Sequence, residues 1–228
     1  MVNKFSYIGK EVVQSFNDNK GIFDLEDIYN LDQDNKWTNR AIGQLELIET
    51  KTISDDSSVS FTNLGSDYKT HLFLINNLHL DDNRDQNLRV EVGGTEQTGS
   101  TDYSRSFRSG FSNGSGFYDD KDDELDRLRL NAEHGGFDPE TSNAYLYMYN
   151  ALQTSKTFFS QFWTYQDKNN ETAFRYGTGS YNKQHILSGV KFYPSTGLLR
   201  SGTISIYGQR SFWCYSFWEK KKRMMLQI

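Results

Sequence analysis

The sequence predicts an all-β fold, an antiparallel β-sandwich of jelly-roll-like type. Segments such as residues 45–53 and 145–149 alternate apolar or aromatic side chains with polar ones, which is the period of a half-buried strand. Turn-forming Gly, Asn, Asp and Ser residues separate these segments, and strands do not alternate with long helices. We therefore expect a sandwich over residues 45–208, with an N-terminal extension at 1–44 and a C-terminal tail at 209–228.

The composition favours a sandwich with an aromatic core. Of the 228 residues, 36% are hydrophobic and 15% are aromatic, so Phe, Tyr and Trp must supply much of the buried surface. The formal net charge of −5 argues against a nucleic-acid partner. The single cysteine, Cys214, excludes an intrachain disulfide framework and fits a reducing compartment. The sequence shows neither a signal peptide nor a long apolar run, so we expect no membrane partner.

Two segments carry the clearest strand predictions. Residues 68–80 form the strongest apolar run, and we expect Leu72, Leu74 and Leu78 to be buried there. Residues 186–208 read as a strand, a turn and a second strand, which predicts a closing hairpin.

Residues 93–130 are expected to form a long loop, because they are rich in Gly and Ser and then acidic. The acidic part favours a solvated charged loop, with a Ca²⁺ site as the alternative, although the carboxylate spacing matches no EF-hand loop. Loops of this length commonly carry binding residues. The candidates for a receptor contact in this loop are Tyr103, Phe107, Phe117 and Tyr118.

The motifs of metal sites and of nucleophilic catalysis are missing from the sequence. The four histidines have no ligand spacing and no neighbouring cysteine, and the sequence has no GxSxG motif. We therefore predict no catalytic, metal-binding or cofactor-binding residues, and no cofactor. Glycosidase chemistry stays open, since it needs only two converging carboxylates.

Both ends of the chain are candidate docking segments. Asp24 is a candidate N-cap for a short helix, and the tail joins an aromatic cluster to the basic run EKKKR. For the tail we favour an arm buried on a neighbouring subunit over a membrane-surface anchor or a segment that folds back on its own domain. The predicted interface residues are Phe23, Leu25, Ile28, Tyr29, Trp37, Phe212, Trp213, Tyr215, Phe217 and Trp218.

Three stretches resemble a group of tailed-bacteriophage virion structural proteins that are common in marine phages. The stretch SGTISIYG at residues 201–208 is similar to the strand, roughly sGtisLYG, that closes their domain. Their Y-x-x-H-L strand is matched by Tyr68, His71 and Leu72, and their N-terminal segment by residues 21–37, which end at Trp37. Residues 209–228 depart from the pattern, since these domains stop soon after the position of Gly208.

The resemblance implies a non-enzymatic structural protein on the virion surface, assembled in the host cytoplasm. Its role would be that of a tail fibre or adaptor, or of a capsid decoration subunit. The expected partners are other virion proteins, such as capsid, portal, adaptor or tail components, and further copies of the chain, with a trimer taken by analogy. The alternative is a lectin-like β-sandwich that binds host-surface glycans, because exposed Tyr and Trp side chains can stack on sugars.

Overall fold

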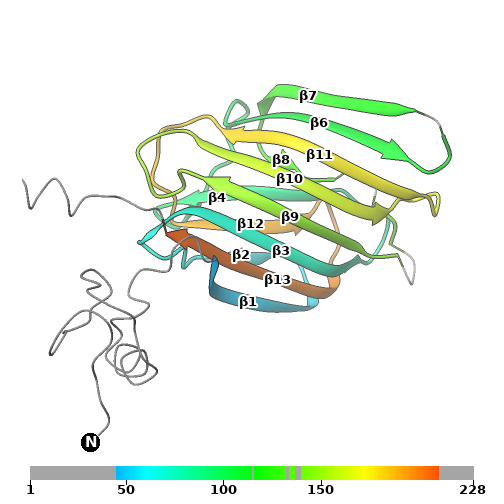
Figure 1. Cartoon of the computed structure of the whole chain (residues 1–228), viewed down its shortest axis with the longest axis horizontal. Helices are drawn as coiled ribbons and strands as arrows, with labels where there is room; N and C mark the ends of the chain where they lie inside the picture. The colour runs from blue at the N-terminus through cyan, green and yellow to red at the C-terminus, as the bar shows by residue number, and fades with distance from the viewer. Residues whose placement is uncertain (1–44, 115, 132–133, 137–139, 211–228) are drawn as a thin grey trace, which may run out of the picture. The chain divides into compact units, whose positions relative to one another are not determined.

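The computed structural model describes residues 45–210 except residue 115, residues 132–133 and residues 137–139 (Figure 1). The described residues form strands, turns and bends, and they contain no helix. The strands in chain order are β1 (Leu45–Asp56), β2 (Val59–Phe61), β3 (Tyr68–Leu80), β4 (Gln86–Val92), β5 (Thr95–Glu96), β6 (Tyr103–Phe111), β7 (Phe117–Leu125), β8 (Leu128–Arg129), β9 (Ser142–Tyr149), β10 (Thr157–Gln166), β11 (Thr172–Tyr181), β12 (Gly189–Pro194) and β13 (Leu199–Arg210).

The strands form two antiparallel sheets that pack face to face (Figure 1). The large sheet has eight strands in the order β1-β13-β3-β9-β10-β11-β6-β7. The small sheet has the order β2-β12-β4-β5, and β8 pairs with β4 beside this path. The prediction of an antiparallel β-sandwich is confirmed, whereas jelly-roll connectivity stays a prediction.

An aromatic cluster joins the two sheets, as the composition predicted. Phe73 of β3 lies with its ring centroid 5.7 Å from that of Phe61 and 5.2 Å from that of Phe192, which come from the small sheet. All three rings are buried and meet edge to face, the arrangement that aromatic pairs prefer. Tyr103 also bridges the layers, since its hydroxyl accepts a hydrogen bond from the Val90 backbone N–H at 2.9 Å.

The burial predicted within β3 is wrong at Leu74. Phe73 and Ile75 point into the core, so Leu74 between them lies on the outer side and is only half-buried. Leu72 is buried as predicted, but it lies outside the core cluster and on the same outer side. The apolar run hides the alternation because both sides of this central strand are apolar. An irregularity after Ile75 shifts the register, and this brings Leu78 to the inner side.

The predicted closing hairpin does not form. Strand β12 belongs to the small sheet and pairs with β2 and β4, whereas β13 belongs to the large sheet and pairs with β1 and β3. The turn at residues 195–198 therefore carries the chain from one layer to the other. Sequence signals of a hairpin and of such a crossing turn are the same at this length, because both need only two strands and a turn.

The long loop predicted at residues 93–130 is also wrong, because strands β5 to β8 occupy most of it. Tyr103 and Phe107 of β6 face the core, and serine residues between them gave the segment its loop-like composition. Strand β7 pairs with β6 at the edge of the large sheet, although it has no apolar side chain between Tyr118 and Leu125. Backbone pairing with β6 holds it there.

The sequence motifs behind the resemblance lie side by side. Gly208 of β13 pairs with His71 of β3, and an added Cβ at Gly208 would lie 2.2 Å from the Tyr68 ring. The His71 ring contacts the Leu64 carbonyl through Nε2 at 2.7 Å, and the Tyr68 hydroxyl donates to Glu46 at 2.7 Å. Two motifs about 130 residues apart in the chain thus form one packing unit, whose first role is to build the sheet.

The predicted N-terminal extension and residues 211–228 of the predicted tail lie outside the described residues, and so do all ten predicted interface residues, whereas Gln209 and Arg210 end β13. Within the part of the chain that the structure describes, no helix is long and apolar enough to cross a membrane.

Candidate functional site: the outer face of the large sheet

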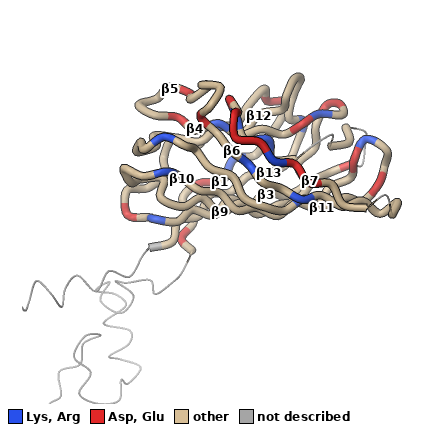
Figure 2. Tube along the Cα trace, turned by 90° about the horizontal axis from the view of Figure 1, so that it is seen from above, with Lys and Arg blue, Asp and Glu red and all other residues tan. Residues whose placement is uncertain are grey.

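The outer face of the large sheet, which faces away from the small sheet, is almost free of charge over its central strands. Strands β3, β9, β10 and β11 together contain only Lys69 and Arg175 as charged side chains, and Arg175 is buried on the inner side. Figure 2 shows the contrast with β7, where acidic residues follow one another along the edge of the sheet. The chain as a whole has a net charge of −5, so a nearly uncharged face over four strands stands out among the residues that the structure describes.

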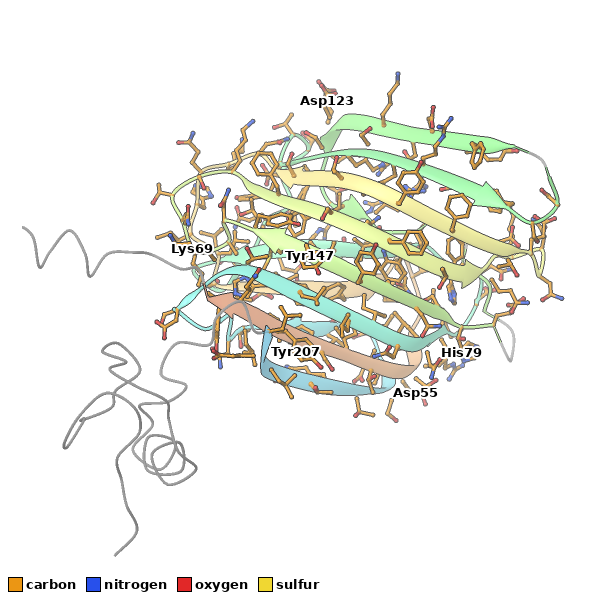
Figure 3. The ribbon with its side chains drawn as sticks, viewed as in Figure 1. Asp55, Lys69, His79, Asp123, Tyr147 and Tyr207 are labelled. Carbon is orange, nitrogen blue, oxygen red and sulfur yellow. The ribbon has the colours of Figure 1, made fainter. Side chains whose placement is uncertain are left out.

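Aromatic rings from four strands of this face form a continuous row, which we name the aromatic ridge. The rings of Tyr145 and Phe162 are nearly parallel with centroids 5.8 Å apart, and those of Phe162 and Phe174 are parallel at 6.5 Å. Tyr176 continues the row at 6.0 Å from Phe174, and Phe117 of β7 contacts Phe174 at 6.1 Å. The members of the ridge are Phe117, Tyr145, Tyr147, Tyr149, Phe162, Phe174 and Tyr176. Figure 3 labels Tyr147 and shows the side chains of this face.

The rings of the ridge remain accessible although they pack on one another. Phe117 is 62% exposed, Tyr145 is 45% exposed and Tyr176 is 43% exposed. Monomeric proteins rarely display contiguous aromatic surface of this kind unless it binds something. The face therefore has the composition of an interface core, in which aromatic residues are enriched and charges are depleted.

Two shallow depressions hollow the face on either side of the ridge. The first, which we name the serine-lined depression, has a volume of about 430 Å³ and is lined by Tyr149, Phe158, Ser104, Ser106, Ser160, Thr178 and Ser180 among others. The second, the apolar depression, has a volume of about 590 Å³ and is lined by Phe111, Phe162, Thr164, Thr172, Phe174 and Tyr176 among others. Small side chains on the outer side of β11 and β6 create the first hollow, because the neighbouring rings of β9 and β10 extend beyond Ser104, Ser106, Thr178 and Ser180.

The acidic stretch is neither a solvated loop nor a Ca²⁺ site in its centre, where Asp120 faces the inner side of β7 and pairs with arginines. Asp120 accepts hydrogen bonds from Arg105 Nε at 2.9 Å and from Arg129 Nη2 at 2.7 Å, and it also pairs with Arg175. Burial acts to raise the pKa of Asp120, but the hydrogen bonds and charges of the three arginines outweigh it and hold the pKa well below its usual range. This cluster anchors β7 to the sheet through an ionised carboxylate.

A polar pocket of about 510 Å³ lies beside this cluster and bears on the glycosidase alternative. Its carboxylates are those of Asp119, Asp120, Asp167 and Glu171. Asp167 accepts hydrogen bonds from the backbone of Glu171 and Asn169, both at 2.9 Å, and Asp119 pairs with an arginine at 3.2 Å. A glycosidase needs one carboxylic acid that stays protonated. Asp120 does not fit this role, because its lowered pKa keeps it ionised. Asp119 forms an ion pair with Arg108, and Asp167 accepts hydrogen bonds within the turn between β10 and β11.

The four predicted receptor residues separate into two pairs. Tyr103 and Phe107 are buried in the core and cannot contact a surface ligand. Phe117 and Tyr118 are exposed on β7, where alternation places them on opposite sides of the strand. Phe117 belongs to the aromatic ridge and carries the Arg108 guanidinium over its ring at 4.9 Å, whereas Tyr118 lines the polar pocket.

Buried histidines serve the fold in the described part of the chain, where no group of three or more His, Cys, Asp or Glu side chains is placed to hold a metal ion. Burial lowers the pKa of His71, against the effect of its contact with the Leu64 carbonyl. Burial and the nearby His79 lower the pKa of His134 to about 4, and the His134 ring stacks on Tyr165. Both imidazoles are therefore neutral at pH 7.

Most members of the aromatic ridge were not among the predicted site residues. The alternation of Tyr145, Tyr147 and Tyr149 with Leu146 and Met148 was visible in the sequence, and it correctly indicates two sides of one strand. The stronger signal is that β9, β10 and β11 carry aromatic residues on the outer side as well as apolar or aromatic residues on the inner side, and have almost no charge. A strand with one side facing water normally carries polar residues there, so this pattern indicates a covered or binding face.

Comparison with known proteins adds no relative to this picture. No protein-family model matches the sequence, and the comparisons with curated proteins and with solved structures find no match.

Proposed function

We propose that this chain is a non-enzymatic structural subunit of a tailed-bacteriophage virion surface, and that it docks through the aromatic ridge. The resemblance of residues 201–208 and of the strand at Tyr68 to virion structural proteins supplies the biological setting. The uncharged aromatic face supplies the means of docking, and it is the observation that carries the proposal.

The chemistry of the face suits a protein partner that contributes apolar side chains. Aromatic residues at the centre of an interface gain free energy by leaving water, and the charged residues at the sheet edge would form the polar rim. Repeated copies on a symmetric particle add avidity, so each contact needs only modest affinity. The virion proteins named above, whether of head or tail, fit this description.

The experiment is immunogold labelling of purified phage particles with an antibody raised against residues 45–208. We expect label on the particle, either over the head or at the tail, and the position decides between a decoration subunit and a tail-fibre or adaptor protein. Particles without label, with the protein found only in the lysate, would contradict the proposal.

A second candidate function is the binding of neutral host-surface glycans by the same ridge. The observation in its favour is that threonine hydroxyls, those of Thr164 and Thr172, lie beside the rings of Phe162, Phe174 and Tyr176 in the apolar depression. Rings that stack on sugar C–H groups next to hydroxyls that bond sugar O–H groups are what such a site needs. Binding to a glycan array that is lost in Tyr176→Ser but kept in Ile186→Ser, a change of an exposed residue outside the large sheet, would favour this candidate.

A further inference from the structure

Strand β13 delivers the C-terminal tail to one end of the outer face. The last residues of β13 start a cross-strand row that runs over the sheet toward β7. Each member pairs with the next one on the neighbouring strand, in the order Gln209, Thr70, Tyr149, Phe158, Ser180 and Ser104. The row contains Tyr149 and Phe158, two of the aromatic residues that line the serine-lined depression, and two of its serines, Ser180 and Ser104. It reaches β7 beside Asp122, which pairs with Arg105.

The residues that follow β13 have the length needed to cross this row. Six strand steps separate β13 from β7, which corresponds to about 29 Å at about 4.8 Å for each step. An extended chain advances about 3.3 Å for each residue. An extended chain that starts at Arg210 would bring Cys214 about 13 Å along the row, the distance of β9 and β10, and Lys220 about 33 Å, the distance of β7.

The order of residue types along the tail matches the order of surfaces along the row. Residues 212–218 read FWCYSFW and would lie over the uncharged central strands, where Phe158 is 49% exposed. Residues 220–223 read KKKR and would arrive at β7. There Asp122, Asp123 and Glu124 are exposed, and none of them forms an ion pair within the described residues. Figure 3 labels Asp123 on this edge strand.

We infer that residues 211–223 of the chain cross the outer face of their own large sheet. The aromatic side chains of the tail cover Tyr149, Phe158 and the serine-lined depression, and its basic run pairs with the acidic end of β7. The far part of the aromatic ridge, around Phe162, Phe174 and Tyr176, stays open for the partner of the proposed function. The inference goes beyond that function and does not depend on it, because it concerns the isolated chain.

The lone cysteine of the chain makes the inference directly testable. Cys214 of the full chain is reduced and labelled with benzophenone maleimide, illuminated at low protein concentration, and the cross-linked peptides are identified by mass spectrometry. We expect cross-links within one chain, concentrated on β9 and β10 near Tyr149 and Phe158. The readout uses purified protein, so it is distinct from the labelling of virions that tests the proposed function.

Two matched variants test the apolar and the charged parts of the contact. Phe158→Lys places a like charge in the path of the tail and is expected to lower the cross-link yield on β9 and β10 at least fivefold. Ile186→Lys changes an exposed apolar residue outside the large sheet and is expected to leave the yield unchanged. The double change Asp123→Lys and Glu124→Lys is expected to lower the yield two- to fivefold. Far-UV circular dichroism and thermal melting establish that each variant folds.

Three outcomes would overturn the inference. The first is cross-links spread over both sheets of the sandwich. The second is cross-links that form only between chains and grow with protein concentration, which would make the tail an arm on a neighbouring subunit. The third is a yield on β9 and β10 that Phe158→Lys does not change in a folded protein.

Discussion

Two hairpins of the large sheet, β9–β10 and β6–β7, differ in the charge of their strands and in the aromatic residues that they expose. The strands of the first contain no charged side chain and display tyrosine and phenylalanine on their outer side. The second carries five acidic residues on β7 alone, and one of them, Asp120, is held by three arginines from the inner side. In the charged hairpin the most buried acidic group is paired within the chain, whereas in the aromatic hairpin rings of the outer side stay partly exposed.

The largest effect is expected at the charged hairpin. Asp120→Ala leaves Arg175 buried without its carboxylate, and breaking a buried pair in this way costs about 3–5 kcal/mol of the free energy of unfolding. Urea denaturation followed by circular dichroism measures the loss. The control is Asp123→Ala on the same strand, which is expected to change stability by less than about 0.5 kcal/mol because the side chain is exposed. Equal losses of stability for the two variants would show that the ion pairs of Asp120 do not stabilise the hairpin more than the exposed Asp123 does.

A pH-dependent loss of stability is expected from groups that are buried neutral. The pKa of His134 is about 4 in the folded protein and about 6.5 when unfolded, so below pH 6.5 the unfolded state binds more protons. Stability therefore falls as the pH drops from 6.5 toward 4, by about 2 kcal/mol at pH 5 from this group alone. Urea denaturation at pH 7 and pH 5 measures it. His134→Phe keeps the stack on Tyr165 and is expected to reduce the loss, while the lowered pKa of His71 preserves a part of it.

A smaller loss is expected where the two resemblance motifs meet. Gly208→Ala places a methyl group against the Tyr68 ring and is expected to cost about 1–3 kcal/mol by overpacking. Combining it with Tyr68→Ala makes room for the methyl group, so the double variant should lose less than the sum of the two single changes. Simple additivity in thermal or urea unfolding would show that the two motifs do not form one unit.

The smallest effect on stability is expected at the aromatic hairpin. Changing Tyr145 to Ser removes a ring that is nearly half exposed and whose stacking on Phe162 is worth about 0.2–1 kcal/mol. The same change should abolish incorporation into phage particles, or reduce it at least tenfold, when virions assembled with the variant are analysed by quantitative mass spectrometry. If the variant is stable and is incorporated at the normal level, the ridge is not the docking surface.

Much of the fold was predictable, and the failures have physical causes. Strands with one apolar side, such as β9 with Leu146 and Met148, were visible because alternation is a local signal. Strand β7 was not visible, because it joins the sheet through backbone pairing and the ion pairs of Asp120 rather than through apolar residues. The sequence also could not show that β12 and β13 belong to different sheets, because this depends on pairings between segments far apart in the chain.

The candidate site was predicted only in part, because exposure is a tertiary property. In the sequence, Tyr103 and Phe107 have the surroundings of a binding loop. In the structure they belong to β6, and their side chains are buried in the core. Phe117 and Tyr118 are exposed, as a receptor contact would require, but they lie on a strand and not in the predicted loop. The remaining ridge residues come from three further strands that the sheet brings together, and no single stretch of sequence shows that they are neighbours.

The proposed docking of the aromatic ridge on the virion can be tested by hydroxyl-radical footprinting, because a covered ring is protected from oxidation. Oxidation of Tyr145 and Tyr176 is compared by mass spectrometry between the isolated protein and purified phage particles, with Tyr118 on the far edge strand as the internal control. If the ridge docks on the virion, Tyr145 and Tyr176 are oxidised readily in the isolated protein and protected at least fivefold in the particle, with Tyr118 little changed. Equal oxidation of the ridge in both samples would contradict the account.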